Sequence, residues 1–161
     1  VDVIYDVCHN IARVEEHVVH GSNCNCCVHR KGATRSFGGD SDELSGEFGG
    51  VGQPVLVPGD MGTSSFVMSG PKKGTNQAFG SSCHGAGRAM SRTQARKEID
   101  GAKVKRELRE KGIAIYETHE KYLSEEAPDA YKDIDDVIRL TDRAGLARPV
   151  ARLRPLIVIK G

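Results

Sequence analysis

Glycine is the residue type that most restricts how this chain folds, because it occurs 19 times in 161 residues. This frequency favours many tight loops between short elements. Aromatic residues make up only 5% of the chain and tryptophan is absent, so the core must be built from Val, Ile, Leu and Ala. Helix-like and strand-like segments are mixed without a regular strand–helix–strand rhythm. The pattern predicts an α+β fold, with mixed or antiparallel sheets and flanking helices.

The expected elements follow from hydrophobic spacing and turn residues. Val1 to Val7 alternates like a buried strand, and Ile11, Val14 and Val18 then recur at the spacing of a short helix. Further strands are expected within 26–37 and at 53–57, 65–68, 113–116 and 153–159, and further helices at 88–99, 103–111 and 133–144. Residues 38–52 are rich in Gly, Asp, Ser and Glu and are expected to form a flexible surface loop.

Charge and cysteine usage limit the classes of partner and compartment. The formal net charge is +1, so any binding of nucleic acid must come from a local basic patch. No apolar run approaches the roughly 18 residues of a membrane span, so no membrane partner is expected. The five cysteines favour a reducing compartment, here the cytoplasm, over a disulfide framework. The chain starts without Met inside an apolar run, so we expect a piece of a longer protein.

The sharpest local motif is Ser-Cys-His-Gly-Ala-Gly-Arg at 82–88. Glycines before an expected helix allow backbone N–H groups to approach a phosphate, and an imidazole there can attack phosphorus or bind a metal. His84 is therefore a candidate catalytic residue, although a glycine turn with a structural histidine remains the alternative. Arg88, Arg92 and Arg96 recur at helical spacing and predict a basic stripe that binds RNA, the alternative being a solvated face.

Three further features can contribute to a site. The loop at 58–65 combines glycines, an aspartate and hydroxyl side chains, which can hold a nucleotide or simply form a turn. His9 and Asn10 follow the first apolar run, where metal ligands often lie, but Asn10 can equally cap a helix. Lys160 follows an apolar strand that can hold it in a site, the alternative being a solvated tail.

A cluster of cysteines allows a different interpretation. Cys24, Cys26, Cys27 and His29 are residue types that bind zinc, but their spacing is not that of the usual zinc-binding pair. A zinc-held binding module therefore stays open as a non-enzymatic alternative.

Taken together, several stretches occur in an order and spacing that resemble the RtcB family of tRNA-splicing ligases over essentially the whole chain. These stretches are Tyr5–Asn10, Val28–Arg35, Gly52–Thr63, Cys83–Arg92, Glu125–Pro128, Ala130–Lys132 and Leu153–Gly161. The resemblance is to the C-terminal portion of a single catalytic domain of the RtcB type. The cysteine cluster and the segment 38–52 depart from the family pattern, which suggests a divergent member.

The resemblance implies roles for individual residues. His84 would take GMP from GTP as a phosphoramidate, and His9 would bind manganese. The implied nucleotide contacts are Asn10, Pro58, Gly59, Asp60, Met61, Ser65, Gly85, Ala86, Gly87 and Lys160.

The resemblance also implies an activity and its cofactors. The family opens an RNA 2′,3′-cyclic phosphate to a 3′-phosphate, transfers GMP onto it, and lets a 5′-hydroxyl displace the GMP. The complete enzyme would use GTP and two manganese ions to join tRNA halves or broken RNA. The remaining metal ligands would lie in a missing N-terminal part of the same protein, so the piece alone is expected to be inactive. Another phosphoryl-transfer enzyme that forms a phosphohistidine remains the second enzymatic hypothesis.

Overall fold

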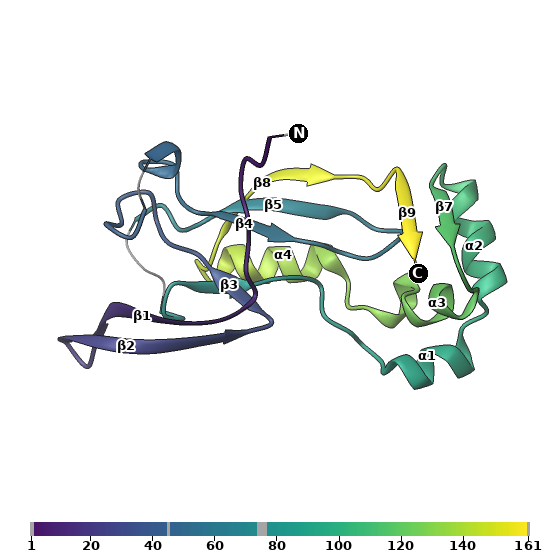
Figure 1. Cartoon of the computed structure of the whole chain (residues 1–161), viewed down its shortest axis with the longest axis horizontal. Coiled ribbons are helices and arrows are strands. Elements are labelled where there is room, and N and C mark those ends of the chain that lie inside the picture. Colours follow the sequence, from purple (N-terminus) through teal and green to yellow (C-terminus); the bar gives the residue numbers. More distant parts are fainter. Residues whose placement is uncertain (1, 45, 74–76, 161) are drawn as a thin grey trace. The chain divides into compact units, whose positions relative to one another are not determined.

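The computed structural model describes residues 2–44, 46–73 and 77–160 and divides into two compact units. Each unit is assembled from stretches that are distant in sequence. The first unit comprises Val1–Leu56, Val67–His84 and Arg139–Val150, and the second comprises Val57–Phe66, Gly85–Ile138 and Ala151–Gly161. Helices occur together with mostly antiparallel strands (Figure 1), which confirms the α+β class. No helix in the described ranges is long and apolar enough to cross a membrane.

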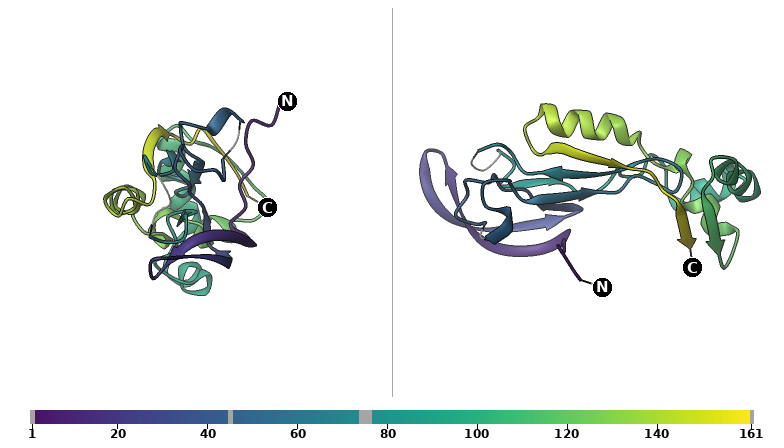
Figure 2. Two further views of the ribbon diagram at one scale, coloured as in Figure 1. Left: turned by 90° about the vertical axis from the view of Figure 1, so that its left-hand side faces the viewer. Right: turned by 90° about the horizontal axis from the view of Figure 1, so that it is seen from above.

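A long antiparallel hairpin opens the first unit. Strand β1 (Asn10–Val19) pairs along its whole length with β2 (Ser22–Lys31), as Figures 1 and 2 both show. His20 and Gly21 form the two-residue turn, with φ angles of 51° and 82°, and positive φ at both positions suits the twist of a hairpin. The helix expected from Ile11 to Val18 is therefore wrong. The β-branched valines favour a strand once a partner strand is available, and this outweighs their helical spacing.

The segment before the hairpin is not the strand that its alternation predicted. Residues 2–8 form no strand, and the side chains of Val3 and Ile4 are each 82% exposed. These residues take part in none of the sheets of the described chain, although the side chain of Tyr5 contacts Gln53 and Phe48. Alternation alone therefore did not make it a strand.

The remaining strands are short. β3 (Ala33–Arg35) pairs antiparallel with β6 (Ser81–Cys83). Another sheet has the strand order β4-β5-β8, with β4 at Pro54–Val57, β5 at Ser65–Ser69 and β8 at Arg148–Leu153. β4 and β5 confirm the strands expected at 53–57 and 65–68. Between β3 and β4 lies the expected loop 38–52, which contains the short 3₁₀ helix η1 (Gly46–Phe48). Its flexibility stays a prediction, and residue 45 lies outside the described residues.

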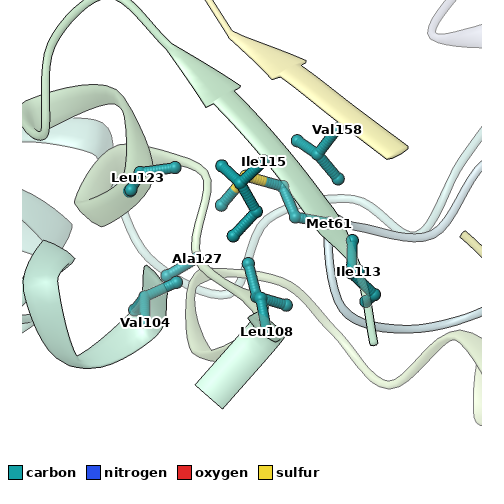
Figure 3. Close-up of a cluster of buried hydrophobic side chains, with 8 residues drawn as sticks. All are labelled: Met61, Val104, Leu108, Ile113, Ile115, Leu123, Ala127 and Val158. Carbon is teal, nitrogen blue, oxygen red and sulfur yellow. The ribbon is translucent and has the colours of Figure 1, made fainter. Parts of the chain in front are cut away.

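The second unit contains short helices and a parallel strand pair. The helices are α1 (Arg92–Glu98), α2 (Gly101–Glu110), α3 (Lys121–Glu125), η2 (Pro128–Ala130) and α4 (Ile134–Arg143), and the last of these continues into the first unit. β7 (Ala114–Glu117) pairs parallel with β9 (Ile157–Lys160). Figure 3 shows the buried cluster around this pair, formed by Met61, Val104, Leu108, Ile113, Ile115, Leu123, Ala127 and Val158. This aliphatic core agrees with the scarcity of aromatic residues.

Two expected boundaries differ in the structure. The helix expected from 88 begins only at Arg92, because the side chain of Ser91 caps it by accepting the Gln94 N–H at 3.2 Å. The single strand expected at 153–159 is two strands, β8 and β9, separated by residues 154–156. Pro155 in that gap has no N–H to donate to a sheet.

A buried ion-pair network holds the first unit together. The carboxylate of Glu15 on β1 is fully buried and accepts two hydrogen bonds from Arg30 on β2, at 3.0 and 2.7 Å. Arg35 donates to the same carboxylate at 2.8 Å. Arg30 Nε also donates to Ser81 Oγ at 2.9 Å, so the hairpin is tied to β6, which leads to His84.

We expect Glu15→Gln to lower the free energy of unfolding by about 3–5 kcal/mol, because it leaves buried guanidinium groups without their counter-charge. Glu16→Gln is the matched control, since Glu16 is the next residue of β1 and is exposed. Urea unfolding of both variants measures the difference. Equal stability of the two variants would show that the network contributes nothing.

The same carboxylate predicts how stability changes with pH. Burial raises the pKa of Glu15, but hydrogen bonds and charge from Arg30, His17 and Arg35 outweigh it and hold that pKa below its ordinary value of 4.5. The contribution of Glu15 is thus complete above about pH 4.5 and is lost as the pH falls through the folded-state pKa. Glu15→Gln should flatten this acid limb in unfolding experiments.

Candidate functional site

Two histidines that are far apart in sequence meet in the first unit. His9 precedes β1 and His84 follows β6, and their rings stack with centroids 4.3 Å apart and planes at 13°. The N–H of Gly32, just after β2, donates to the His9 carbonyl at 2.9 Å. A Cβ on Gly32 would lie 3.6 Å from His84 Cδ2, so this glycine backbone passes close to the ring. Pairing of β1 with β2 and of β3 with β6 thus brings the predicted metal ligand and the predicted nucleophile together.

The environment of His84 favours its neutral form. Burial lowers the pKa of His84, and the charge of His9 lowers it further. A neutral imidazole has a lone pair that can attack phosphorus or bind a metal ion. Within the described ranges the ring of His84 stacks on that of His9. The role of His84 as a nucleophile stays a prediction.

The glycine-rich stretch after His84 differs from the expected helix start. Helix α1 begins at Arg92, so Gly85, Ala86 and Gly87 do not sit at a helix N-terminus. The N–H of Ala86 donates to the Pro58 carbonyl at 3.0 Å. The helix-dipole argument for phosphate binding was therefore wrong, because Ser91 sets the start of the helix four residues later.

The second loop, Pro58 to Ser65, is held by its own polar groups. Asp60 accepts the N–H of Gly62 at 2.8 Å and the hydroxyl of Thr63 at 2.7 Å. Ser65 Oγ accepts the N–H of Gly59 at 3.3 Å. A Cβ on Gly59 would lie 2.1 Å from the Ser64 carbonyl oxygen, so only glycine fits there. The loop is therefore preformed, and part of its hydrogen-bonding capacity is used internally.

A cavity of about 340 Å³ opens beside this loop in the second unit. Its walls include six of the ten residues expected to bind nucleotide, namely Pro58, Gly59, Asp60, Met61, Ser65 and Lys160. Apolar residues of β9 and the polar side chains of Glu126 and Tyr131 complete much of the wall. Asn10, Gly85, Ala86 and Gly87 do not line this cavity, and Asn10 is the first residue of β1, not a helix cap. A mostly preformed pocket with a few polar groups is typical of a small-ligand site.

The three arginines do not form one helical stripe. Arg88 lies before α1, and only Arg92 and Arg96 are on that helix. Arg88 and Arg92 donate to Glu126 at 3.3 and 3.1 Å, and Arg96 pairs with Glu125 at 3.4 Å. The side chains of Arg92 and Arg96 are still 62% and 47% exposed, so both remain accessible to a phosphate. Their RNA-binding role stays a prediction.

We expect the double variant Arg92→Gln/Arg96→Gln of the complete protein to bind RNA more weakly and with less dependence on salt. Losing two contacts to single-stranded phosphates should reduce the slope of log K against log salt by about 1.4. The matched control is Lys103→Gln/Arg106→Gln, which removes two exposed charges from α2. If the RNA affinity and its salt dependence match those of the wild type, the two arginines are only exposed surface residues and do not bind RNA.

The cysteine cluster does not form a zinc site. Cys24, Cys26, Cys27 and His29 all lie on β2, where successive side chains point to opposite faces. Cys27 Sγ lies 3.5 Å from His29 Nε2, while Cys24 and Cys26 are on the other face. In the described part of the chain, no three His, Cys, Asp or Glu side chains converge as metal ligands. The zinc-held module is therefore not supported.

Comparison with known proteins decides the family. The sequence profile described as "tRNA-splicing ligase RtcB" matches residues 1–161. The chain belongs to this family. It is 52% identical over 160 residues to a tRNA-splicing ligase RtcB of Archaeoglobus fulgidus, covering 99% of this chain and 33% of that protein. The corresponding proteins of Nanoarchaeum equitans (48% identity, 99% of this chain, 34% of the relative) and Methanopyrus kandleri (48%, 100%, 17%) are also similar. The chain thus spans about a third or less of these curated relatives.

The structure of this RtcB-family chain adds two residues that motif analysis did not assign. Glu126 and Tyr131 line the cavity with Lys160. Burial and a hydrogen bond to Glu126 raise the pKa of Tyr131, so its hydroxyl stays protonated and can donate. For Glu126, burial raises the pKa, but the Tyr131 hydrogen bond and nearby cations outweigh it and lower the pKa overall. Both residues lie within the stretches that carried the family resemblance, but nothing local in sequence indicates that they meet.

Proposed function

We propose that the complete protein is a GTP-dependent RNA ligase, which joins RNA 2′,3′-cyclic phosphate or 3′-phosphate ends to 5′-hydroxyl ends through a GMP–histidine intermediate. The observation that carries this proposal is that one cavity is lined by six of the residues expected to contact the nucleotide, in a chain of the RtcB family. The stacking of His9 on His84 supports it independently.

The proposed reaction has a hydrolytic opening and three transfers. Water first opens a 2′,3′-cyclic phosphate to a 3′-phosphate where the RNA carries one. A nitrogen of His84 attacks the α-phosphorus of GTP, so a P–N bond forms and pyrophosphate leaves. An oxygen of the RNA 3′-phosphate then attacks the same phosphorus, and the imidazole leaves. Finally the 5′-hydroxyl attacks the RNA phosphorus, GMP leaves, and a phosphodiester is formed.

Individual residues of this chain support the first transfer. Burial beside His9 keeps His84 neutral, as a nucleophile must be. The Pro58–Ser65 loop and Lys160 would hold the guanylate, since amide, hydroxyl and ammonium groups can all donate to its oxygen atoms. Asn10, Gly85, Ala86 and Gly87 remain proposed contacts outside this cavity.

Manganese is proposed as the metal cofactor, with His9 among its ligands. Bound metal ions would neutralise phosphate charge and polarise phosphorus. The described residues do not fit a complete metal site, because no three candidate ligands converge. We therefore propose that the other ligands, for two ions, belong to the part of the complete protein that this chain does not span. No step above depends on their geometry.

The proposed partners are GTP and RNA, either tRNA halves from splicing or broken RNA, and the proposed location is the cytoplasm. The relatives are called tRNA-splicing ligases, which supports tRNA halves as the RNA substrate.

The position of the retained label tests this function. The complete protein is incubated with manganese and with GTP that carries radioactive phosphorus in either the α or the γ position. Guanylylation predicts retention of the α label only, whereas a phosphohistidine enzyme retains the γ label. Retention of the γ label, or of neither, would contradict the ligase assignment, and joining of RNA 3′-phosphate and 5′-hydroxyl ends completes the test.

A further inference from the structure

The carboxylate of Glu126, in the wall of the cavity, contacts polar side chains from separate parts of the second unit. Glu126 is the C-cap residue of α3, and its side chain is only 18% exposed. It accepts a hydrogen bond from the hydroxyl of Tyr131, which follows η2. Lys160 Nζ, at the end of β9, lies 3.9 Å away on the same carboxylate oxygen. Glu126 therefore links Tyr131 and Lys160, which are both residues of the cavity wall.

Arg88 reinforces this arrangement from another side. Its guanidinium donates to Glu126 at 3.3 Å, to the Tyr131 hydroxyl at 3.2 Å and to the Glu125 carbonyl at 2.5 Å. The same guanidinium lies 4.9 Å from the centroid of the Tyr131 ring. Tyr131 is thus held through both its hydroxyl and its ring face.

We propose that Glu126 is a positioning residue of the nucleotide site, which holds Tyr131 and Lys160 in place before GTP binds. It acts through these two side chains and not on the reacting atoms. A long lysine and a tyrosine that are already ordered lose less conformational freedom on binding, so the ligand binds more tightly. The inference rests on the proposed GTP-binding function and assigns a role to a residue for which the sequence suggested none.

Glu125 provides a matched control for the test. It is the preceding residue and also a carboxylate paired with arginines, to Arg92 at 3.8 Å and Arg96 at 3.4 Å. It does not line the cavity. Glu126→Gln and Glu125→Gln therefore remove the same charge one residue apart, and only the first alters the bonds to Tyr131 and Lys160.

The experiment measures guanylylation of the complete protein against GTP concentration at fixed manganese. Glu126→Gln should raise the GTP concentration at half-maximal rate about tenfold and change the maximal rate little. The reason is that Tyr131 and Lys160 would then lose their conformational freedom only when GTP binds, which weakens binding. Glu125→Gln should behave like the wild type. Thermal unfolding of each variant shows whether the fold is kept.

A double-mutant cycle separates positioning from general structural damage. Tyr131→Phe removes the hydroxyl that donates to Glu126. If Glu126 acts through Tyr131, the double variant Glu126→Gln/Tyr131→Phe should bind GTP about as weakly as Glu126→Gln alone. Additive effects, a lowered maximal rate without a change in half-saturation, or wild-type behaviour of Glu126→Gln would each overturn the inference. Failure of the wild type and Glu125→Gln to take up GMP at all would instead contradict the proposed function.

Discussion

His84→Ala in the complete protein is expected to abolish attachment of GMP from GTP, lowering the labelling rate by more than about a thousandfold. The reason is chemical: without the imidazole no lone pair is available to form the P–N bond. Structural disturbance should be small, because His84 is partly exposed and lies at the end of β6 outside the aliphatic core. The measurement is the rate of label uptake from α-labelled GTP, with acid lability and alkali stability as the signature of a phosphoramidate.

His119→Ala is the matched control for this variant. His119 is exposed and contacts the ring of Tyr122, away from both the histidine pair and the cavity lining. It should label at the wild-type rate. Undiminished labelling of His84→Ala would be fatal to the assignment of the nucleophile.

The second large effect concerns the 161-residue chain expressed alone. We expect it to take up no GMP and to bind manganese too weakly to saturate in calorimetry. Among the described residues, only His9 and His84 meet as candidate ligands at the predicted site, and a labile divalent ion needs more ligands in fixed positions for tight binding. Exposed apolar side chains such as Val3, Ile4 and Leu156 should also make the isolated chain prone to aggregate.

Calorimetric titration with manganese and GTP labelling of the same preparation test this expectation. The matched control is the complete protein, measured at equal concentration. Tight manganese binding together with guanylylation of the isolated chain would show that these residues contain a whole catalytic centre.

Elements with strong local signals were predictable from sequence. Asp133 caps α4, accepting the N–H groups of Asp135 and Asp136, and Gly145 follows the helix with a φ of 66°. Likewise α2 ends before Gly112, whose φ is 78° and whose neighbour Ile113 donates back to Leu108 at 3.0 Å. These boundaries depend on a few adjacent residues, so a sequence contains all the information that they need.

Elements that depend on distant pairing were not predictable in the same way. The spacing of Ile11, Val14 and Val18 fits a helix, but pairing with β2 across the His20–Gly21 turn decides for a strand. Arg88 fits the spacing of a helical stripe, yet its backbone pairs with that of Tyr131, 43 residues later in the chain. Periodicity describes one segment at a time and contains no information on which partner is present.

The residues of the candidate site also differ in whether local sequence was enough to predict them. His84, His9 and the Pro58–Ser65 loop were found because each belongs to a compact motif, and the structure brings them into a histidine pair and a cavity wall. Glu126 was not found, because its role arises only when Tyr131 and Lys160 approach it from other segments.

Mapping the modified residue is the most direct test of the central claim, that His84 carries GMP. The complete protein is allowed to react with GTP and manganese, digested under alkaline conditions that preserve a phosphoramidate, and sequenced by tandem mass spectrometry. The account predicts a guanylyl group on His84 in the peptide that contains Cys83 to Gly85. A guanylyl group on a lysine or on another histidine, with unmodified His84, would contradict it.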